Sequence, residues 1–362
     1  MSETSALKAP AAASTRRVLI VDDCAISRAL LRIAFEADGR LAVVGEAASA
    51  TEARKAIRRV RPDVLTLDIE MPGMDGLAFL QHLMALDPLP VVMISGATKG
   101  NSEATIQALS MGAIDCLLKP ESRMTPQVAR QISDSVYAAA SSKVTGEFSG
   151  PTALPARAAL SLRASSQLVL IGASTGGIAA LEQVLPVLAP KGPPVVIAQH
   201  IPTPFLESLV ERMDRKLPQS VSLAQGQQKL KPGQIVFAPA ETQQLEMVAG
   251  RSSWHVRLMP RAPDAQYCPS INHLFCSAIP RGAMAAAVIL TGLGTDGANG
   301  LLGLRKAGAM TIGQDEGTSA VYGMPKEASR IGAVRRELPV QSIGNAIRAA
   351  VEAQATGQPV NF

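Results

Sequence analysis

The chain has 362 residues, 47% of them hydrophobic, a length and composition that favour two globular domains. Its formal net charge is only +5 and 3% of its residues are aromatic, so neither a basic stripe nor a base-stacking surface points to nucleic-acid binding. The four cysteines show no C-x-x-C spacing, no signal peptide opens the chain, and no apolar run is long enough to span a bilayer. We therefore expect a cytoplasmic protein without membrane insertion.

Short apolar runs alternate with helical patterns through the first part of the chain. Residues 1–15, rich in Ala, Ser and Thr, predict a disordered tail. Strand-like runs follow at 18–23, 41–47, 63–68, 89–95 and 113–120, and helical spacing at 26–37, 51–60, 77–86 and 125–140. This alternation predicts one α/β domain over residues 16–140, built on a doubly wound parallel sheet.

Reactive side chains stand where these runs end. Asp22, Asp23, Asp68, Ser95 and Lys119 fall at the carboxyl ends of predicted strands, the edge at which such sheets bind ligands. A single aspartate there is more commonly a turn residue, but five polar groups at matching ends favour a functional site. Crowded carboxylates need a cation, and their hard oxygen ligands suit Mg²⁺. A carboxylate beside Mg²⁺ is able to attack phosphorus while a lysine balances the phosphoryl charge.

The motifs VLIVDD, LDIEMPGMDG, MISG and GAIDCLLKP make residues 17–121 similar to two-component response regulator receiver domains, which implies a flavodoxin-like fold. Asp68 would then be phosphorylated by a histidine kinase, with Ser95 as the switch hydroxyl and Lys119 as the phosphate partner. The Mg²⁺ ligands that the resemblance implies are Asp22, Asp23, Asp68 and the backbone carbonyl of Glu70. The chain departs from the family at Cys116, where an aromatic switch residue is usual.

The second domain begins after a Ser/Ala-rich stretch, residues 141–166, whose two prolines and lack of apolar periodicity predict a linker. We place this domain at residues 167–354 and expect an α/β fold with a mainly parallel sheet. Its first segment, LVLIGASTGG, predicts a strand, a sharp turn and a helix. Ser174 has the G-x-S-x-G spacing of a nucleophile elbow, although the same spacing fits a phosphate cradle or a plain strand–helix turn.

Two further strand ends supply a histidine and an aspartate. His200 ends the apolar run VVIAQH, and Asp296 follows the run AAAVIL, which breaks in glycines. Acyl transfer requires a hydroxyl, an imidazole base and a carboxylate that orients the base, although a lone histidine or aspartate at a strand end is more commonly structural. The helix that begins after Gly176 and Gly177 would direct free N–H groups toward Ser174 as candidate oxyanion donors.

Shorter elements lie between these strand ends. The segment 231–241 predicts a hairpin-like β element, and 243–250 and 253–260 predict a pair of strands. Ser270 is a candidate N-cap of an amphipathic helix.

Residues 166–354 are similar to the catalytic domain of the chemotaxis protein-glutamate methylesterases, the CheB family, through IGASTGG, VVIAQHIPTPF, CPSINHLF, LTGLGTDGANGL and TIGQDEGTSAVYGMPKEA. The resemblance implies Ser174 as the nucleophile, His200 as the base and Asp296 as its orienting partner. It also implies that Thr175 assists the histidine and that the backbone at Leu293 belongs to the oxyanion region. No cofactor is implied for this domain.

A receiver followed by this domain implies a phosphorylation-activated serine hydrolase that demethylates glutamate methyl esters on chemoreceptor cytoplasmic helices, with glutamine deamidation as a further reaction. Phosphorylation would relieve blockage of the cleft by the receiver. The chain departs from the family at Pro239-Ala240, at Gln244, near which a histidine is usual, and at Asn272, where an aspartate is usual. Two other hypotheses stay open. One is a phosphorylation-controlled adaptor that binds signalling proteins without efficient hydrolysis, which the departures at Cys116, Gln244 and Asn272 favour. The other is an esterase for a different protein in a chemotaxis-like pathway.

Overall fold

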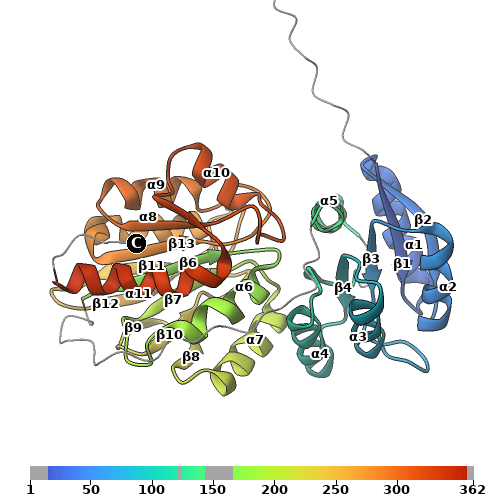
Figure 1. The fold of residues 1–362 in the computed structure, drawn as a ribbon, viewed down its shortest axis with the longest axis horizontal. Coiled ribbons are helices and arrows are strands. Elements are labelled where there is room, and N and C mark those ends of the chain that lie inside the picture. Colours follow the sequence, from blue (N-terminus) through green and yellow to red (C-terminus); the bar gives the residue numbers. More distant parts are fainter. Residues whose placement is uncertain (1–14, 121–123, 143–165, 357–362) are drawn as a thin grey trace, which may run out of the picture.

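The computed structural model of the chain describes residues 15–120, 124–142 and 166–356, which form two α/β domains (Figure 1). The tail expected at 1–15 and the linker expected at 141–166 lie almost wholly outside these residues. Within them, no helix combines the length and the apolar character needed to cross a membrane. Both domains contain a parallel sheet, which confirms the predicted fold class.

The N-terminal domain is a five-stranded parallel sheet in the order β2-β1-β3-β4-β5. Its elements are β1 (Arg16–Val21), α1 (Ala25–Asp38), β2 (Leu41–Ala47), α2 (Ala50–Val60), β3 (Val64–Leu67), α3 (Gly76–Leu86), β4 (Val91–Ser95), α4 (Lys99–Ser110), β5 (Asp115–Leu118) and α5 (Pro126–Ala140). In β1, Val18 and Ile20 pack on the side of α1 and α5, and Leu19 and Val21 pack on the side of α2, α3 and α4. Because helices cover both faces, the central strands are continuous apolar runs.

The C-terminal domain contains a seven-stranded parallel sheet in the order β15-β14-β13-β6-β7-β10-β8, and a small antiparallel sheet in the order β11-β12-β9. Its first elements are β6 (Leu168–Ala173), α6 (Gly177–Val184), β7 (Val195–Gln199), α7 (Thr203–Lys216), β8 (Ser220–Leu223), β9 (Gln227–Lys229), β10 (Gln234–Phe237), β11 (Gln243–Ala249) and β12 (Trp254–Pro260). The remaining elements are α8 (Ile271–Ala278), β13 (Ala285–Ile289), α9 (Ala298–Lys306), β14 (Met310–Gln314), α10 (Met324–Arg330), β15 (Arg336–Leu338) and α11 (Val340–Thr356), with 3₁₀ segments at Leu185–Val187 and Ile279–Met284. Helices α6, α7 and α11 pack on one face of the large sheet, and α8, α9 and the small sheet pack on the other.

The predicted hairpin at 231–241 is wrong. Strand β10 lies inside the large sheet, where it pairs in parallel with β7 on one side and β8 on the other. Its residues Ile235, Val236 and Phe237 are fully buried, so they need a covered position that a two-stranded hairpin does not offer. The expected pairing of the next two strands is present, because β11 and β12 form an antiparallel ladder.

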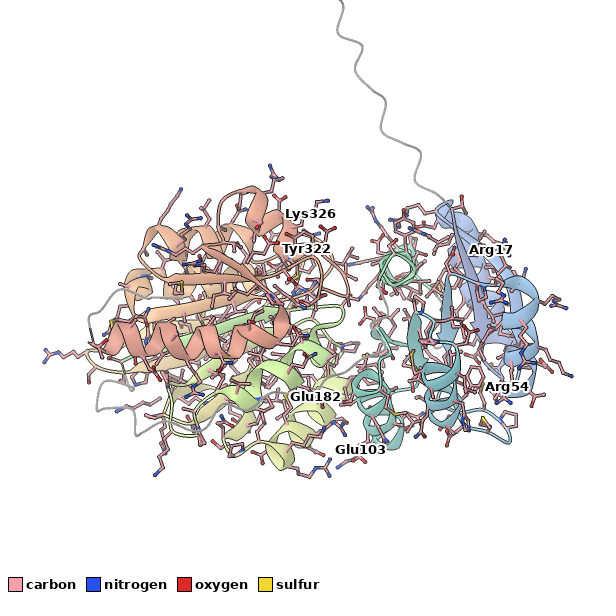
Figure 2. The ribbon with its side chains drawn as sticks, viewed as in Figure 1. Arg17, Arg54, Glu103, Glu182, Tyr322 and Lys326 are labelled. Atoms are coloured by element: carbon pink, nitrogen blue, oxygen red, sulfur yellow. The ribbon has the colours of Figure 1, made fainter. Side chains whose placement is uncertain are left out.

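The two domains contact each other through α4 of the first and α6 and α7 of the second. Glu182 of α6 accepts a hydrogen bond from Ser110 Oγ of α4 at 3.0 Å, and it lies at this boundary in Figure 2. Arg212 of α7 donates to Glu182 at 3.2 Å and to Ser110 Oγ at 3.0 Å. This network holds the loop before β5 close to the carboxyl edge of the large sheet, where Ile114 meets Gly176.

Candidate active site

Three neighbouring strands bring Ser174, His200 and Asp296 to one edge of the large sheet. Ser174 follows β6, His200 follows β7, and Asp296 lies in the loop after β13. Strand β6 is paired with β7 on one side and with β13 on the other. The chain runs from β6 to β7 in one direction along the sheet, and from β13 to β14 in the opposite direction. Such a switch in strand order opens a crevice at the carboxyl ends, which is where parallel α/β sheets bind ligands.

The turn around the serine, residues 173–177, is built from small residues because its neighbours are close. Gly176 has φ of +78°, and a Cβ atom added there would lie 2.5 Å from Ala320 Cβ. The Ser174 N–H donates to Thr291 O at 3.0 Å, and the Gly177 N–H donates back to Ser174 O at 2.8 Å. These bonds fix the backbone of Ser174 at the start of α6.

His200 and Asp296 are in direct contact. Nε2 of the imidazole lies 3.0 Å from Asp296 Oδ2. The start of α8 supplies three more donors to the same carboxylate: the N–H of Ile271 at 2.7 Å, the N–H of Asn272 at 2.9 Å and Ser270 Oγ at 3.2 Å. Burial by itself raises the pKa of Asp296, but the hydrogen bond and charge of His200 and the backbone donors outweigh it and hold the pKa below its usual value. The carboxylate is therefore an anion that orients the imidazole.

This contact assigns the two ring nitrogens of His200. With Nε2–H donating to Asp296, the lone pair of a neutral ring is on Nδ1, which is the nitrogen left to take a proton from a nucleophile. Within the described ranges, Ser174 Oγ makes no hydrogen bond to the ring of His200. Gln199 instead joins the two residues through their backbones, because its Nε2 donates to Ser174 O at 2.9 Å and to His200 O at 3.0 Å.

Two residues of this site were missed in the sequence. Gln199 directly precedes His200 and is only 2% exposed. A polar residue at the end of the apolar run VVIAQH was the sequence signal that could have pointed to it. Tyr267 stacks on the His200 ring with centroids 4.9 Å apart, and no local pattern pointed to it. The departure at Gln244 also has a structural role, because its side chain bonds Tyr267 O at 2.7 Å.

The N-terminal domain occupies groups beside the serine. Thr175 Oγ1 donates to Asp115 Oδ2 at 2.8 Å, and the Gly176 N–H donates to Ile114 O at 2.9 Å. The N–H groups of Gly176 and Gly177, which immediately precede and begin α6, therefore both have partners, since a neighbouring domain and the turn itself supply acceptors. Thr175 points its hydroxyl at Asp115 in this arrangement.

A small cavity lies between the domains at this contact. Ser174 and His200 line it from one side, and Asp115 and Cys116 line it from the other. Cys116, the departure from the aromatic switch residue, is 2% exposed, and burial raises the pKa of its thiol. The candidate nucleophile and base thus face the N-terminal domain directly.

The loop after β13 contains Leu293. A Cβ atom added to the preceding residue, Gly292, would lie 2.6 Å from Ser174 Cβ, so this loop passes directly beside the serine. Among the hydrogen bonds of the described residues, none uses the backbone N–H of Leu293 as a donor. That N–H is available to an oxyanion.

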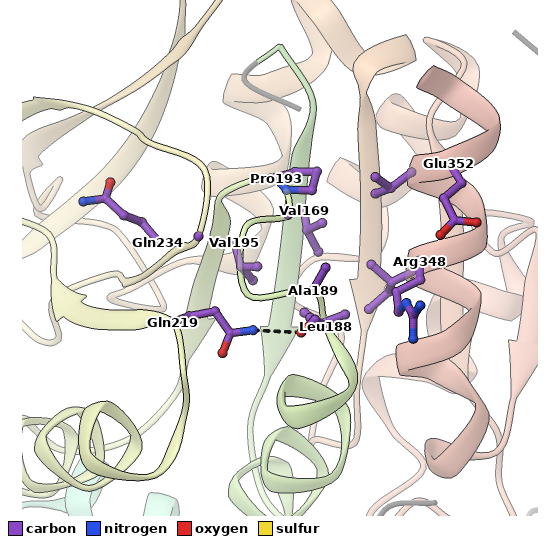
Figure 3. A pocket seen from close by; sticks show the side chains of 13 residues that line it. Val169, Leu188, Ala189, Pro193, Val195, Gln219, Gln234, Arg348 and Glu352 are labelled. Atoms are coloured by element: carbon purple, nitrogen blue, oxygen red, sulfur yellow. Dashed lines mark hydrogen bonds between the residues drawn. The ribbon is translucent and has the colours of Figure 1, made fainter. Parts of the chain in front are cut away.

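A second cavity lies elsewhere in the C-terminal domain (Figure 3). Val169, Val195 and Gln234 line it at the amino ends of β6, β7 and β10, and Arg348 and Glu352 of α11 close its side. Because Ser174 and His200 follow the carboxyl ends of the same strands, this cavity is on the opposite edge of the sheet.

The N-terminal domain brings its predicted polar residues together as well. Ligand oxygens of Asp22, Asp23 and Asp68 all lie within 4.8 Å of one another. Lys119 Nζ lies 2.6 Å from Asp68 and 3.0 Å from Asp22. Burial raises the pKa of Asp68 to about 6, against the opposing effects of Lys119 and of a hydrogen bond from the backbone of Glu70. Three clustered carboxylates, two of which contact the Lys119 ammonium, supply an acidic set of oxygen ligands that fits a hard divalent cation.

Comparisons with known proteins match both domains. Residues 18–128 match the family described as response regulator receiver domain, and residues 169–347 match the family described as CheB methylesterase. A crystal structure of the Thermotoga maritima CheB methylesterase catalytic domain is 30% identical, with a TM-score of 0.48, over 51% of this chain and 97% of that one.

Full-length relatives cover nearly the whole chain. A protein from Rhizobium johnstonii named protein-glutamate methylesterase/protein-glutamine glutaminase 1 is 42% identical over 94% of this chain and 98% of its own length. A protein of the same name from Caulobacter vibrioides is 43% identical over 91% of this chain and 96% of its own length. The chain therefore belongs to the protein-glutamate methylesterase/protein-glutamine glutaminase family, with a response regulator receiver domain followed by a CheB methylesterase domain.

Proposed function

We propose that the chain is a phosphorylation-activated serine hydrolase that demethylates glutamate methyl esters of chemoreceptors and deamidates glutamines in the same receptor helices. The observation that carries this proposal is the convergence of Ser174, His200 and Asp296 at the switch point of one parallel sheet. Relatives over 40% identical along nearly the full chain bear the names of both reactions.

In the proposed acylation, Ser174 Oγ attacks the ester carbonyl carbon while its proton passes to Nδ1 of His200. Asp296, already bonded to Nε2, stabilises the imidazolium that forms. The tetrahedral oxyanion collapses, the carbon–oxygen bond to the methoxy group breaks, and His200 returns the proton, so methanol leaves and an acyl-enzyme remains. With a glutamine substrate, the same proton leaves with ammonia.

Deacylation reverses the roles. Water attacks the acyl carbon while His200 takes its proton; the bond to Ser174 Oγ then breaks, His200 returns the proton to that oxygen, and the glutamate product is released and ionises to the carboxylate. The backbone N–H of Leu293 is the donor that we assign to the oxyanion in both halves, since its loop passes beside Ser174 and the N–H is not otherwise used.

We further propose that a histidine kinase phosphorylates Asp68. Its carboxylate attacks phosphorus, the bond from phosphorus to the donor nitrogen breaks, and Lys119, already bonded to Asp68, balances the charge. Mg²⁺ bound by Asp22, Asp23, Asp68 and the Glu70 carbonyl would neutralise phosphoryl oxygens. Ser95 is the switch hydroxyl, because its Oγ is buried at the end of β4, has no hydrogen-bond partner among the described residues, and is available to a phosphoryl oxygen.

Phosphorylation would control access to Ser174 through the domain contact. The receiver residues Ile114 and Asp115 bond Gly176 and Thr175, so a receptor helix and the receiver compete for the same turn. Activation then requires that the receiver leave this turn. We assign the protein to the cytoplasm, where its four free thiols would stay reduced.

The test is methanol release from methylated receptor fragments by the full-length protein, with and without Mg²⁺ and a small phosphodonor. We expect release to be stimulated by the donor in the wild type, abolished in Ser174→Ala and unresponsive to the donor in Asp68→Ala. Release that survives in Ser174→Ala would refute the triad. No release from any fragment, with donor-dependent receptor binding intact, would favour the adaptor hypothesis, and release from a non-receptor protein alone would favour the third.

A further inference from the structure

An aromatic ring covers one face of the candidate base. Tyr267 lies on His200 with the ring centroids 4.9 Å apart and the planes within 1° of parallel. The imidazole is thus bounded at its edge by Asp296 Oδ2, 3.0 Å from Nε2, and on a face by the phenol ring. Only 16% of the His200 side chain is exposed. These two contacts leave the ring little freedom to rotate out of the plane that presents Nδ1.

The segment that carries Tyr267 also orders Asp296. Three residues after Tyr267, Ser270 donates its hydroxyl to Asp296 Oδ1 at 3.2 Å, and the N–H groups at the start of α8 bond the same carboxylate. Tyr267 and Ser270 are tied together by Gln244 of β11, which is 5% exposed. Its Nε2 donates to Tyr267 O at 2.7 Å, and its Oε1 accepts from the Ser270 N–H at 2.7 Å.

Parallel stacking has a consequence for proton transfer. A π face attracts a cation, and during the proposed reaction His200 becomes a cation when it takes the proton of the nucleophile or of water. The Tyr267 ring therefore stabilises the imidazolium more than the neutral imidazole, and so stabilises the transition state more than the ground state.

We propose that Tyr267 is a positioning residue for His200, held in register with Asp296 by the Gln244 amide. The inference rests on the proposed function, since it assigns a second support to the base of that reaction. It also gives the departure at Gln244 a role: one side chain fixes the spacing between the stacking ring and the donors of the orienting carboxylate.

The charged and titratable groups that face His200 are few. Asp296 meets Nε2 from the loop before α9, Tyr267 covers the face from the segment before α8, and Asp115 of the receiver acts on the ring electrostatically from β5. Cys116 lines the same cavity. The test therefore uses the phosphorylated full-length protein, in which the proposed activation moves Asp115 and Cys116 away from His200. Asp296 and Tyr267 then remain as the groups that contact the ring.

The experiment compares Tyr267→Phe, which keeps the ring, with Tyr267→Leu and Tyr267→Met, which fill the space without one. Methanol release by the phosphodonor-treated full-length variants is followed as kcat and KM across pH. We expect Tyr267→Leu and Tyr267→Met to lose about twofold to thirtyfold in kcat, with KM nearly unchanged, and the acidic limb of their profiles to move to lower pH. Tyr267→Phe should keep both the rate and the limb, because among the described residues the Tyr267 hydroxyl only accepts a long hydrogen bond, 3.4 Å, from Gln266 Nε2.

A readout without substrate separates this inference from the proposed function. The downfield proton resonance of His200 Nε2–H, assigned by its loss in His200→Gln, should persist in Tyr267→Phe and broaden in Tyr267→Leu and Tyr267→Met. Gln244→Met, which has similar length but no amide, should broaden it too. An unchanged resonance and pH profile in both ringless variants would overturn the proposal, as would a loss in Tyr267→Phe as large as theirs. If the wild type releases no methanol, the proposed function fails while the resonance still decides the role of Tyr267.

Discussion

We predict that Asp115→Ala raises ester hydrolysis by the unphosphorylated protein. Asp115 stands at the start of β5 and accepts a hydrogen bond from Thr175 Oγ1 at 2.8 Å, across the domain contact. The same oxygen accepts from Ser135 Oγ within the receiver at 2.6 Å. Truncation to alanine removes the acceptor from Thr175 while the backbone bond from Gly176 to Ile114 stays possible.

The size of the effect follows from the strength of that bond. Hydrogen bonds to charged groups contribute about 1.5–3 kcal/mol, and we take the lower end because this one is only partly buried. A change of about 1.4 kcal/mol is tenfold in an equilibrium constant, so the closed arrangement should lose about tenfold relative to the open one. While the closed form predominates, the basal rate rises by the same factor, and the phosphorylated rate stays where it was.

The assay is methanol release from a methylated receptor fragment without phosphodonor, set against the rate with donor for the same variant. Ser135→Ala is the matched control, because it removes a hydrogen bond to the same carboxylate from inside the receiver and leaves Thr175 its partner. We expect it to change the basal rate by less than Asp115→Ala does. A basal rate in Asp115→Ala equal to that of the wild type, with the fold intact by far-UV circular dichroism, would refute the argument that this contact restrains the enzyme.

Three other predictions concern stability. An added Cβ at Gly76 would lie 1.9 Å from Asp68 O, so Gly76→Ala should destabilise the receiver by about 1–3 kcal/mol in urea and reduce phosphoryl incorporation. Gly100→Ala, with open space around it, is its control, and equal stability of the two would contradict the packing argument. Asn272 Oδ1 accepts a 2.6 Å bond from an α9 amide, so Asn272→Ala should cost about 1–3 kcal/mol, whereas Asn272→Asp keeps an acceptor oxygen and should cost less in the same titration. Because the pKa of Asp296 is held below its ordinary 3.8, its folded form binds the proton more weakly than its unfolded form. The stability advantage of the wild type over Asp296→Asn should be full above that pH and shrink as pH falls further, and an advantage that grows in acid would exclude the assignment.

The local sequence was sufficient to predict where individual strands lie and which residues follow each strand end. The apolar runs of β6 and β7 end where the side chains become partly exposed, so the positions of Ser174 and His200 at strand ends followed from the pattern alone. Alternating strands and helices require parallel crossovers, which place all those ends on one edge of a sheet. The convergence of Ser174, His200 and Asp296 was therefore predictable, while their catalytic roles stay proposals.

Tertiary structure decided which strands are neighbours and which distant side chains meet. The sequence of β10 fits a hairpin strand and a buried parallel strand equally well. Its position between β7 and β8, with which it pairs in parallel, is known only from the tertiary structure. The Thr175–Asp115 hydrogen bond joins residues 60 apart in different domains, so no local sequence periodicity predicts it. The stacking of Tyr267 on His200 was equally unpredictable, because nothing in the sequence around either residue indicates that the two rings meet. Contacts of this sort depend on how complete surfaces pack, and that is set by the whole fold.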